Sequence, residues 1–136
     1  MSSPLSALIV DDEEELAGLY RQFIASMGFD TISFTRPLMA LEHYQKNPYK
    51  YSLVVTDLRM PGISGIELAN KIRILNSSAK IFLITAFDAL DLENDLAFKS
   101  AKFCKILQKP IKLATLKTII EENMDLKSKS FLLKNI

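Results

Sequence analysis

Acidic, hydroxyl and cationic side chains stand at the ends of short apolar segments along this sequence. The first of four such segments leads to the pair Asp11 and Asp12. The other three lead to Asp57, to Thr85 and to Lys109, respectively. The steps between these positions are 46, 28 and 24 residues, each close to one or two strand–helix repeats. If the apolar segments are parallel strands of one sheet, the side chains that follow them meet at its carboxyl edge, where open α/β sheets bind ligands. The spacing therefore predicts one site assembled from distant parts of the chain.

The carboxylates of this predicted site require a cation. Carboxylates held within a few ångströms repel one another, and one takes up a proton unless a cation neutralises the cluster. Asp11, Asp12 and Asp57 offer oxygen ligands only, with no His or Cys nearby, which favours Mg²⁺, with Mn²⁺ as the alternative, over zinc. Because Mg²⁺ commonly binds carboxylates together with phosphate oxygens, the site predicts a phosphoryl group as its missing ligand.

The other side chains of the predicted site suit phosphoryl transfer. Thr85 can donate a hydrogen bond to a phosphoryl oxygen, and Lys109 adds a positive charge. Asp57 is the best candidate nucleophile, since it stands alone at the end of the central apolar segment and Thr85 has no neighbouring base to activate it. The sequence contains no GxxxxGK[ST] phosphate loop, which disfavours ATP as the direct donor. The expected product is an aspartyl phosphate.

Two hydrophobic periodicities alternate along the chain and predict the elements that position these residues. Short apolar runs predict strands, and apolar residues spaced three and four apart predict helices. The predicted strands span residues 5–10, 29–35, 51–56, 81–85 and 103–107. The predicted helices span residues 13–27, 37–46, 66–76, 88–100 and 113–124, the third preceded by a Ser64–Glu67 capping box.

Strict alternation of strand and helix predicts an α/β fold with parallel strands, right-handed crossovers and helices on both faces. Five units are too few for a closed eight-unit barrel, so we expect an open, doubly wound, five-stranded sheet. A chain of 136 residues has the length of one domain. We expect this domain to span residues 1–124, with residues 125–136 forming either a C-terminal helix extension or a tail.

Composition and charge exclude several functional classes. The 17 basic and 16 acidic residues leave a net charge of +1, which disfavours direct nucleic-acid binding. No apolar run is long enough to insert into a membrane, and the first is too short for a signal peptide, so we expect a cytoplasmic protein. The single cysteine, Cys104, lies in an apolar stretch that predicts a buried thiol in a reducing compartment. We further expect His43 on a helix surface and Met27, Met39 and Met124 in the core.

Four segments resemble the signatures of the receiver domain of two-component response regulators, in family order and spacing. They are LIVDDEE at residues 8–14, VVTDLRMPGISG at 54–65, LITA at 83–86 and LQKP at 107–110. The resemblance, to single-domain receivers of the chemotaxis type, covers residues 5 to 124 and implies a flavodoxin-like sheet of order 2-1-3-4-5. It implies that Asp57 accepts a phosphoryl group from a phosphohistidine of a sensor histidine kinase.

The resemblance also implies a role for each site residue. Asp12 and Asp57, helped by Asp11 and the backbone carbonyl of Arg59, would hold Mg²⁺. Thr85 and Lys109 would contact the phosphoryl group, and the Lys109–Pro110 bond is usually cis in the family. Such a protein is a phosphoacceptor switch and not an enzyme, because it catalyses only its own phosphotransfer and autodephosphorylation.

The output implied by the resemblance is a protein–protein interaction. A downstream protein would bind the face formed by the fourth helix, fifth strand and fifth helix. Apart from the resemblance, the apolar spacing of residues 125–136 is compatible with a helix that contacts a partner or a second copy of the chain. Ile106 departs from the family, which usually has a Tyr or Phe there whose ring moves with the residue at Thr85. We therefore expect signalling to rest on Thr85 and on movement of the fourth helix.

Two other functional classes stay open at this point. One is a receiver-like module that binds its partners without being phosphorylated. Ile106 favours this class, whereas the intact acidic residues argue against it. A phosphohydrolase of the haloacid-dehalogenase type also uses an Asp nucleophile and Mg²⁺. Such an enzyme needs a second Asp two residues after the nucleophile, where this sequence has Arg59.

Overall fold

The computed structural model describes residues 5–86, 92 and 94–124, and in this part of the chain five strands alternate with five helices. The strands are β1 (Ser6–Val10), β2 (Asp30–Phe34), β3 (Leu53–Asp57), β4 (Ile81–Thr85) and β5 (Lys105–Gln108). The helices are α1 (Glu14–Ser26), α2 (Pro37–Lys46), α3 (Gly65–Leu75), α4 (Leu96–Ala101) and α5 (Leu113–Asn123). Most of the predicted boundaries lie within two residues of these.

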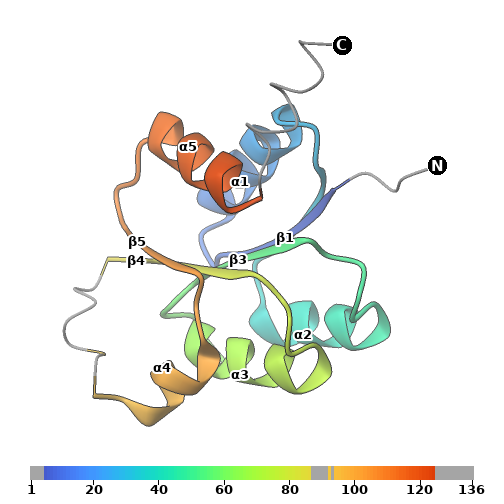
Figure 1. The fold of residues 1–136 in the computed structure, drawn as a ribbon, viewed down its shortest axis with the longest axis vertical. Coiled ribbons are helices and arrows are strands. Elements are labelled where there is room, and N and C mark those ends of the chain that lie inside the picture. The colour runs from blue at the N-terminus through green and yellow to red at the C-terminus, as the bar shows by residue number, and fades with distance from the viewer. Residues whose placement is uncertain (1–4, 87–91, 93, 125–136) are drawn as a thin grey trace.

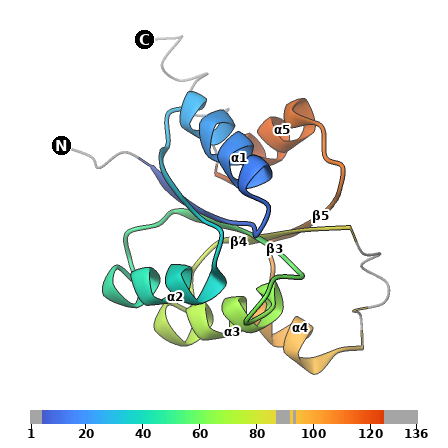
Figure 2. The same cartoon turned by 180° about the vertical axis from the view of Figure 1, so that it is seen from behind.

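The five strands form one parallel sheet in the order β2-β1-β3-β4-β5. Helices α1 and α5 cover one face of the sheet, and α2, α3 and α4 cover the other (Figures 1 and 2). The predicted open, doubly wound, flavodoxin-like fold is therefore confirmed. Within the described residues, no helix has the length and apolar character needed to cross a membrane.

The three central strands send alternate side chains into two cores, one on each face of the sheet. The core under α2 and α3 contains Leu8, Val10, Val54 and Ile81. The core under α1 and α5 contains Ala7, Ile9, Val55, Phe82 and Ile84. Because both faces are covered, the continuous apolar runs are fully buried and the carboxyl ends of these strands are held firmly in place.

The fourth helix is shorter than predicted. Of the residues predicted to begin it, 88–91 and 93 lie outside the described residues, and α4 itself starts at Leu96. The prediction placed Asp95 inside the helix, but its side chain caps the helix by accepting hydrogen bonds from the backbone N–H groups of Ala97 (2.8 Å) and Phe98 (3.1 Å). Residues 125–136, predicted as an extension or tail, also lie outside the described residues.

Two residues predicted to be buried are exposed. Cys104 is an exposed free thiol, because it precedes β5, an edge strand whose side chains are only partly covered. Met39 is 50% exposed, since the inward stripe of α2 consists of Ala40, Leu41 and Tyr44. Met27 and Met124 do pack against the core under α1 and α5, as predicted.

His43 is less exposed than predicted. Its Nε2 atom lies 2.5 Å from the hydroxyl oxygen of Tyr51, and its ring contacts the ring of Phe34. His43 therefore joins α2 to the edge of the sheet.

Candidate functional site

The carboxyl ends of β1, β3, β4 and β5 surround a hollow of about 230 Å³, which we call the acidic pocket. Its lining residues are Asp12, Glu13, Asp57, Arg59, Thr85, Ala86 and Lys109. Asp11, only 2% exposed, lies close enough to pair with Lys109. The structure thus brings together all the residues predicted for the site, although they come from four separate strand ends.

Backbone hydrogen bonds continue the sheet just beyond the strands and so fix the site residues. The N–H of Asp11 donates to the carbonyl of Phe34 (3.1 Å), and the N–H of Lys109 donates to the carbonyl of Thr85 (2.9 Å). Asp57 is itself the last residue of β3 and lies in register with Ile84 of β4. The backbone at these positions is therefore held in place by the sheet.

Lys109 pairs with two carboxylates at once. Its Nζ atom lies 3.1 Å from Oδ2 of Asp11 and 3.3 Å from Oδ2 of Asp57. Burial acts to lower the pKa of Lys109, but the hydrogen bond and charge of Asp11, together with those of Asp57, outweigh it and raise the pKa above its usual value. Lys109 therefore stays protonated at neutral pH.

Asp57 is harder to ionise than an ordinary aspartate. Burial and, next, the negative charge of Asp11 raise its pKa, whereas Lys109 and the N–H of Leu58, which donates to Oδ1 at 2.8 Å, act to lower it. The net direction of the pKa shift is upward, because burial and the nearby Asp11 carboxylate outweigh Lys109 and the Leu58 N–H. The N–H of Leu58 also fixes the orientation of the Asp57 carboxylate.

The three aspartates are close enough to share a metal ion. One carboxylate oxygen from each of Asp11, Asp12 and Asp57 lies within 4.8 Å of the others. Asp11 is buried and Asp12 is exposed, so the cluster opens to solvent on one side. An oxygen-only donor set with an open side fits Mg²⁺, which keeps several of its waters.

The close packing of Gly65 against the end of β3 was not predicted from the sequence. Gly65 begins α3 directly against the end of β3: a Cβ atom there would lie 2.0 Å from the carbonyl oxygen of Asp57. The N–H of Gly65 donates to the carbonyl of Leu58 (2.7 Å), and Ser64 caps α3 by accepting from the N–H of Glu67 (3.1 Å). Of these contacts, only the Ser64–Glu67 cap was predicted from the sequence. The Lys109–Pro110 bond is cis, as the family resemblance implied.

A further hydrophobic cluster contains Ile106, the residue at the position where the family usually has a Tyr or Phe. Ile106 is half-buried there and packs with Leu58, Phe98 and Phe103. The rings of Phe98 and Phe103 lie 5.7 Å apart. This cluster therefore joins the residue after Asp57 to helix α4.

A family model described as the response regulator receiver domain matches residues 7–121, which is most of the chain. The chain belongs to the response regulator receiver family. Receiver domains are phosphoacceptor switches of two-component systems, and they bind Mg²⁺ at an acidic pocket. They interact with histidine kinases and downstream effectors and are generally not true enzymes.

Relatives of this receiver domain differ in length. It is 30% identical to the response regulator receiver protein CpdR of Brucella abortus over 85% of this chain and 92% of CpdR. It is 31% identical to the response regulator protein PilR of Pseudomonas aeruginosa over 90% of this chain but 26% of PilR. The crystal structure of response regulator protein TrrA from Thermotoga maritima, in complex with Mg²⁺-BeF, matches with a TM-score of 0.75 and 29% identity, over 87% of this chain and 97% of that one.

Proposed function

We propose that this receiver domain accepts a phosphoryl group on Asp57 from a phosphohistidine of a sensor histidine kinase. The observation that carries the proposal is the geometry of the acidic pocket, in which three aspartates lie within 4.8 Å and Lys109 bridges two of them. We assign Asp11, Asp12 and Asp57, with the backbone carbonyl of Arg59, to the Mg²⁺ site, which could also hold Mn²⁺.

In the proposed reaction, a carboxylate oxygen of Asp57 forms a bond to phosphorus as the bond from phosphorus to the donor imidazole nitrogen breaks. The imidazole leaves with the electron pair of that bond. Mg²⁺, when bound by the three aspartates, would supply positive charge that stabilises the phosphoryl oxygens. Thr85 donates a hydrogen bond to one of these oxygens, and Lys109 contributes its ammonium charge.

Phosphorylation then changes the charge balance of the pocket. It adds about two negative charges next to Lys109, which already pairs with Asp11 and Asp57. Thr85 and Lys109 lie at the ends of β4 and β5, so a shift at either residue reaches α4, β5 and α5. We propose that this face binds a downstream protein and changes its affinity with phosphorylation.

We extend the proposal to the bounds of the receiver unit and to its cellular compartment. Residues 1–124 would form the receiver unit, and residues 125–136 would extend it as a helix or tail that could support a homodimer. The exposed free thiol of Cys104 fits a reducing compartment such as the cytoplasm.

Phosphorylation by a small-molecule donor tests the assignment of Asp57. Wild-type protein incubated with acetyl phosphate and Mg²⁺ is expected to gain one phosphoryl group by intact-mass spectrometry. Asp57→Asn should gain none, and Asp30→Asn, at an exposed position on β2, should label like wild type.

Two results would overturn the assignment. Equal labelling of Asp57→Asn would show a different acceptor. Complete failure of the wild type to label would favour the phosphorylation-independent module, and steady turnover of a phosphoester would favour the phosphohydrolase.

A further inference from the structure

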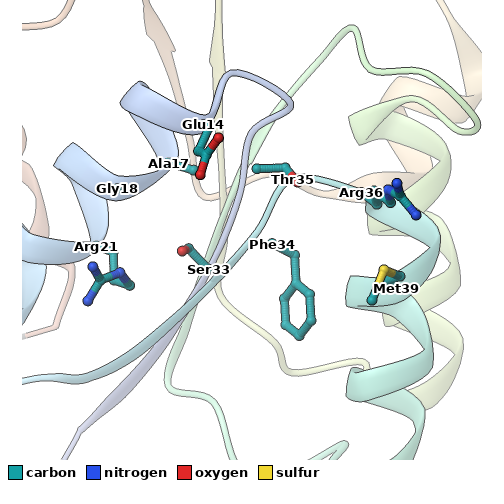
Figure 3. Close-up of a pocket in the computed structure, with 9 residues that line it drawn as sticks. All are labelled: Glu14, Ala17, Gly18, Arg21, Ser33, Phe34, Thr35, Arg36 and Met39. Atoms are coloured by element: carbon teal, nitrogen blue, oxygen red, sulfur yellow. The ribbon is translucent and has the colours of Figure 1, made fainter.

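A second hollow lies between α1, the end of β2 and the start of α2, and we call it the arginine groove (Figure 3). Its volume is about 380 Å³, within the range of roughly 300–1,000 Å³ that ligand pockets occupy. Its lining residues are Glu14, Ala17, Gly18, Arg21, Ser33, Phe34, Thr35, Arg36 and Met39. None of these lines the acidic pocket, so the groove is a separate feature of the surface.

Two arginines from different helices line the groove. Arg21 comes from α1 and Arg36 is the N-cap residue of α2, and Figure 3 shows them on opposite sides of Ser33. Among the described residues, neither guanidinium has an ion-pair partner. A guanidinium presents five N–H donors in a planar fork that matches a carboxylate. Glu14 is the one acidic lining residue, so the lining carries a net positive charge.

Exposed apolar side chains continue the groove on the side of α2. Met39 lines it and is 50% exposed, and its neighbour Leu38 is 55% exposed. The Leu38 side chain reaches the loop after β3, where it lies 3.6 Å from the position of a Cβ atom on Gly62. A simple anion would use the two arginines and leave this apolar surface uncovered.

We propose that the arginine groove binds an acidic segment of a partner protein that also carries an apolar side chain. Carboxylates of this segment pair with Arg21 and Arg36, and its apolar side chain covers Leu38 and Met39. The charge and the apolar surface of the groove together select this occupant. The bound segment would contact the loop that follows Asp57, yet the proposal does not depend on phosphorylation of Asp57.

A panel of synthetic peptides tests this proposal on the full chain. Each eight-residue peptide carries two Asp or Glu residues and one Leu, and the spacing between them varies across the panel. With ¹⁵N-labelled protein, we expect shifts of backbone amide signals at Arg21, Ser33, Arg36, Leu38 and Met39. Peptides with Ser in place of Leu, or with Asn and Gln in place of the acids, should bind more weakly.

Matched variants assign the binding to the groove. Arg21→Gln and Arg36→Gln should each weaken binding of the best peptide about tenfold, the loss expected for a charge-assisted hydrogen bond. Arg21→Lys keeps the charge but not the fork and should lose less. Lys71→Gln, at an exposed position on α3, should bind like wild type. Asp57→Asn should also bind like wild type, which separates this proposal from the assignment of the phosphoacceptor.

Four results would overturn the proposal. One is that no peptide of the panel shifts the groove signals, and another is that Lys71→Gln weakens binding as much as the arginine variants. Inorganic phosphate that reproduces the peptide shifts at equal concentration would show a plain anion site. A short oligothymidine that binds the groove more tightly than the peptides would show a nucleic-acid surface.

Discussion

Lys109 is the residue whose present ion pairs the proposed phosphorylation would change most directly. In the structure its ammonium group neutralises Asp11 and Asp57, which would otherwise repel each other. A phosphoryl group on Asp57 would compete for the same ammonium group. The ammonium group that pairs with these two carboxylates is therefore the one that would respond to phosphorylation of Asp57.

Gly65 is a second residue on which the position of Asp57 depends. We predict that Gly65→Ala lowers the free energy of unfolding by about 1–3 kcal/mol, because the new Cβ atom would overlap a backbone carbonyl that cannot easily move. The displaced β3 end should also weaken Mg²⁺ binding. Urea unfolding and metal titration by fluorescence or calorimetry measure the two effects.

Gly18→Ala is the matched control for this prediction. Gly18 lies inside α1, and a Cβ atom there would meet nothing within 4 Å. The substitution should raise the free energy of unfolding by about 0.5–1 kcal/mol through helix propensity alone. Equal effects of the two substitutions would contradict the role assigned to Gly65.

Among the helices, α4 is held both by the apolar contacts of Phe98 and by polar side chains of α3. Ala101 is the only buried residue of α4, and Leu96 is 80% exposed. Arg73 donates from Nε to the carbonyl of Ala101 (2.8 Å) and from Nη2 to the carbonyl of Lys102 (2.7 Å). Asn70 donates to the carbonyl of Ala97 (2.8 Å). The end of α4 is thus fixed to α3.

We predict that Arg73→Gln lowers the free energy of unfolding by about 1–3 kcal/mol, because it removes several charge-assisted hydrogen bonds to backbone carbonyls. Amide hydrogen exchange at the end of α4 should become faster, including at Lys102, whose N–H donates to the carbonyl of Lys99. Lys71→Gln on the same helix should change neither quantity. Unchanged exchange in Arg73→Gln would show that apolar contacts alone hold α4.

The contact of α2 with the sheet edge should depend on pH through His43. Burial, and then the charges of Lys50 and Lys46, lower the pKa of His43 below its usual value of 6.5. The unfolded chain therefore binds the proton more readily, and the stability from neutral His43 is present above pH 6.5 and lost as pH falls through the lower folded-state pKa.

His43→Gln removes this titration and keeps a polar atom near Tyr51. We predict that the urea midpoint of wild type falls relative to that of His43→Gln as pH decreases from 7 to 5. The comparison is made at fixed ionic strength. A difference between the two proteins that stays constant over this range would contradict the prediction.

At the scale of the whole molecule, hydrophobic periodicity predicted the fold and the location of the site. Apolar runs and helical stripes report which side chains are buried, and strand ends in a parallel sheet must meet at one edge. The acidic pocket could therefore be located from Asp11, Asp57, Thr85 and Lys109 before any coordinates. The strand order came only from the family resemblance, since periodicity does not specify which strands are neighbours.

Features that depend on tertiary contacts of polar groups were not predictable in this way. Arg73 looks like an ordinary helix-surface residue in the sequence, yet it binds carbonyls on other segments. Asp95 lies inside a pattern that predicts one longer helix, yet in the structure it caps the start of α4. Cys104 lies in an apolar stretch, but its exposure depends on its place beside an edge strand.

The central claim is that the acidic pocket binds Mg²⁺ so that Asp57 can become an acyl phosphate. The most direct test is to incubate the protein with acetyl phosphate, reduce the product with borohydride and map the modified residue by peptide mass spectrometry. We expect homoserine at position 57 when Mg²⁺ is present and none when the metal is removed with EDTA. Reduction at another aspartate, or equal modification with and without metal, would contradict it.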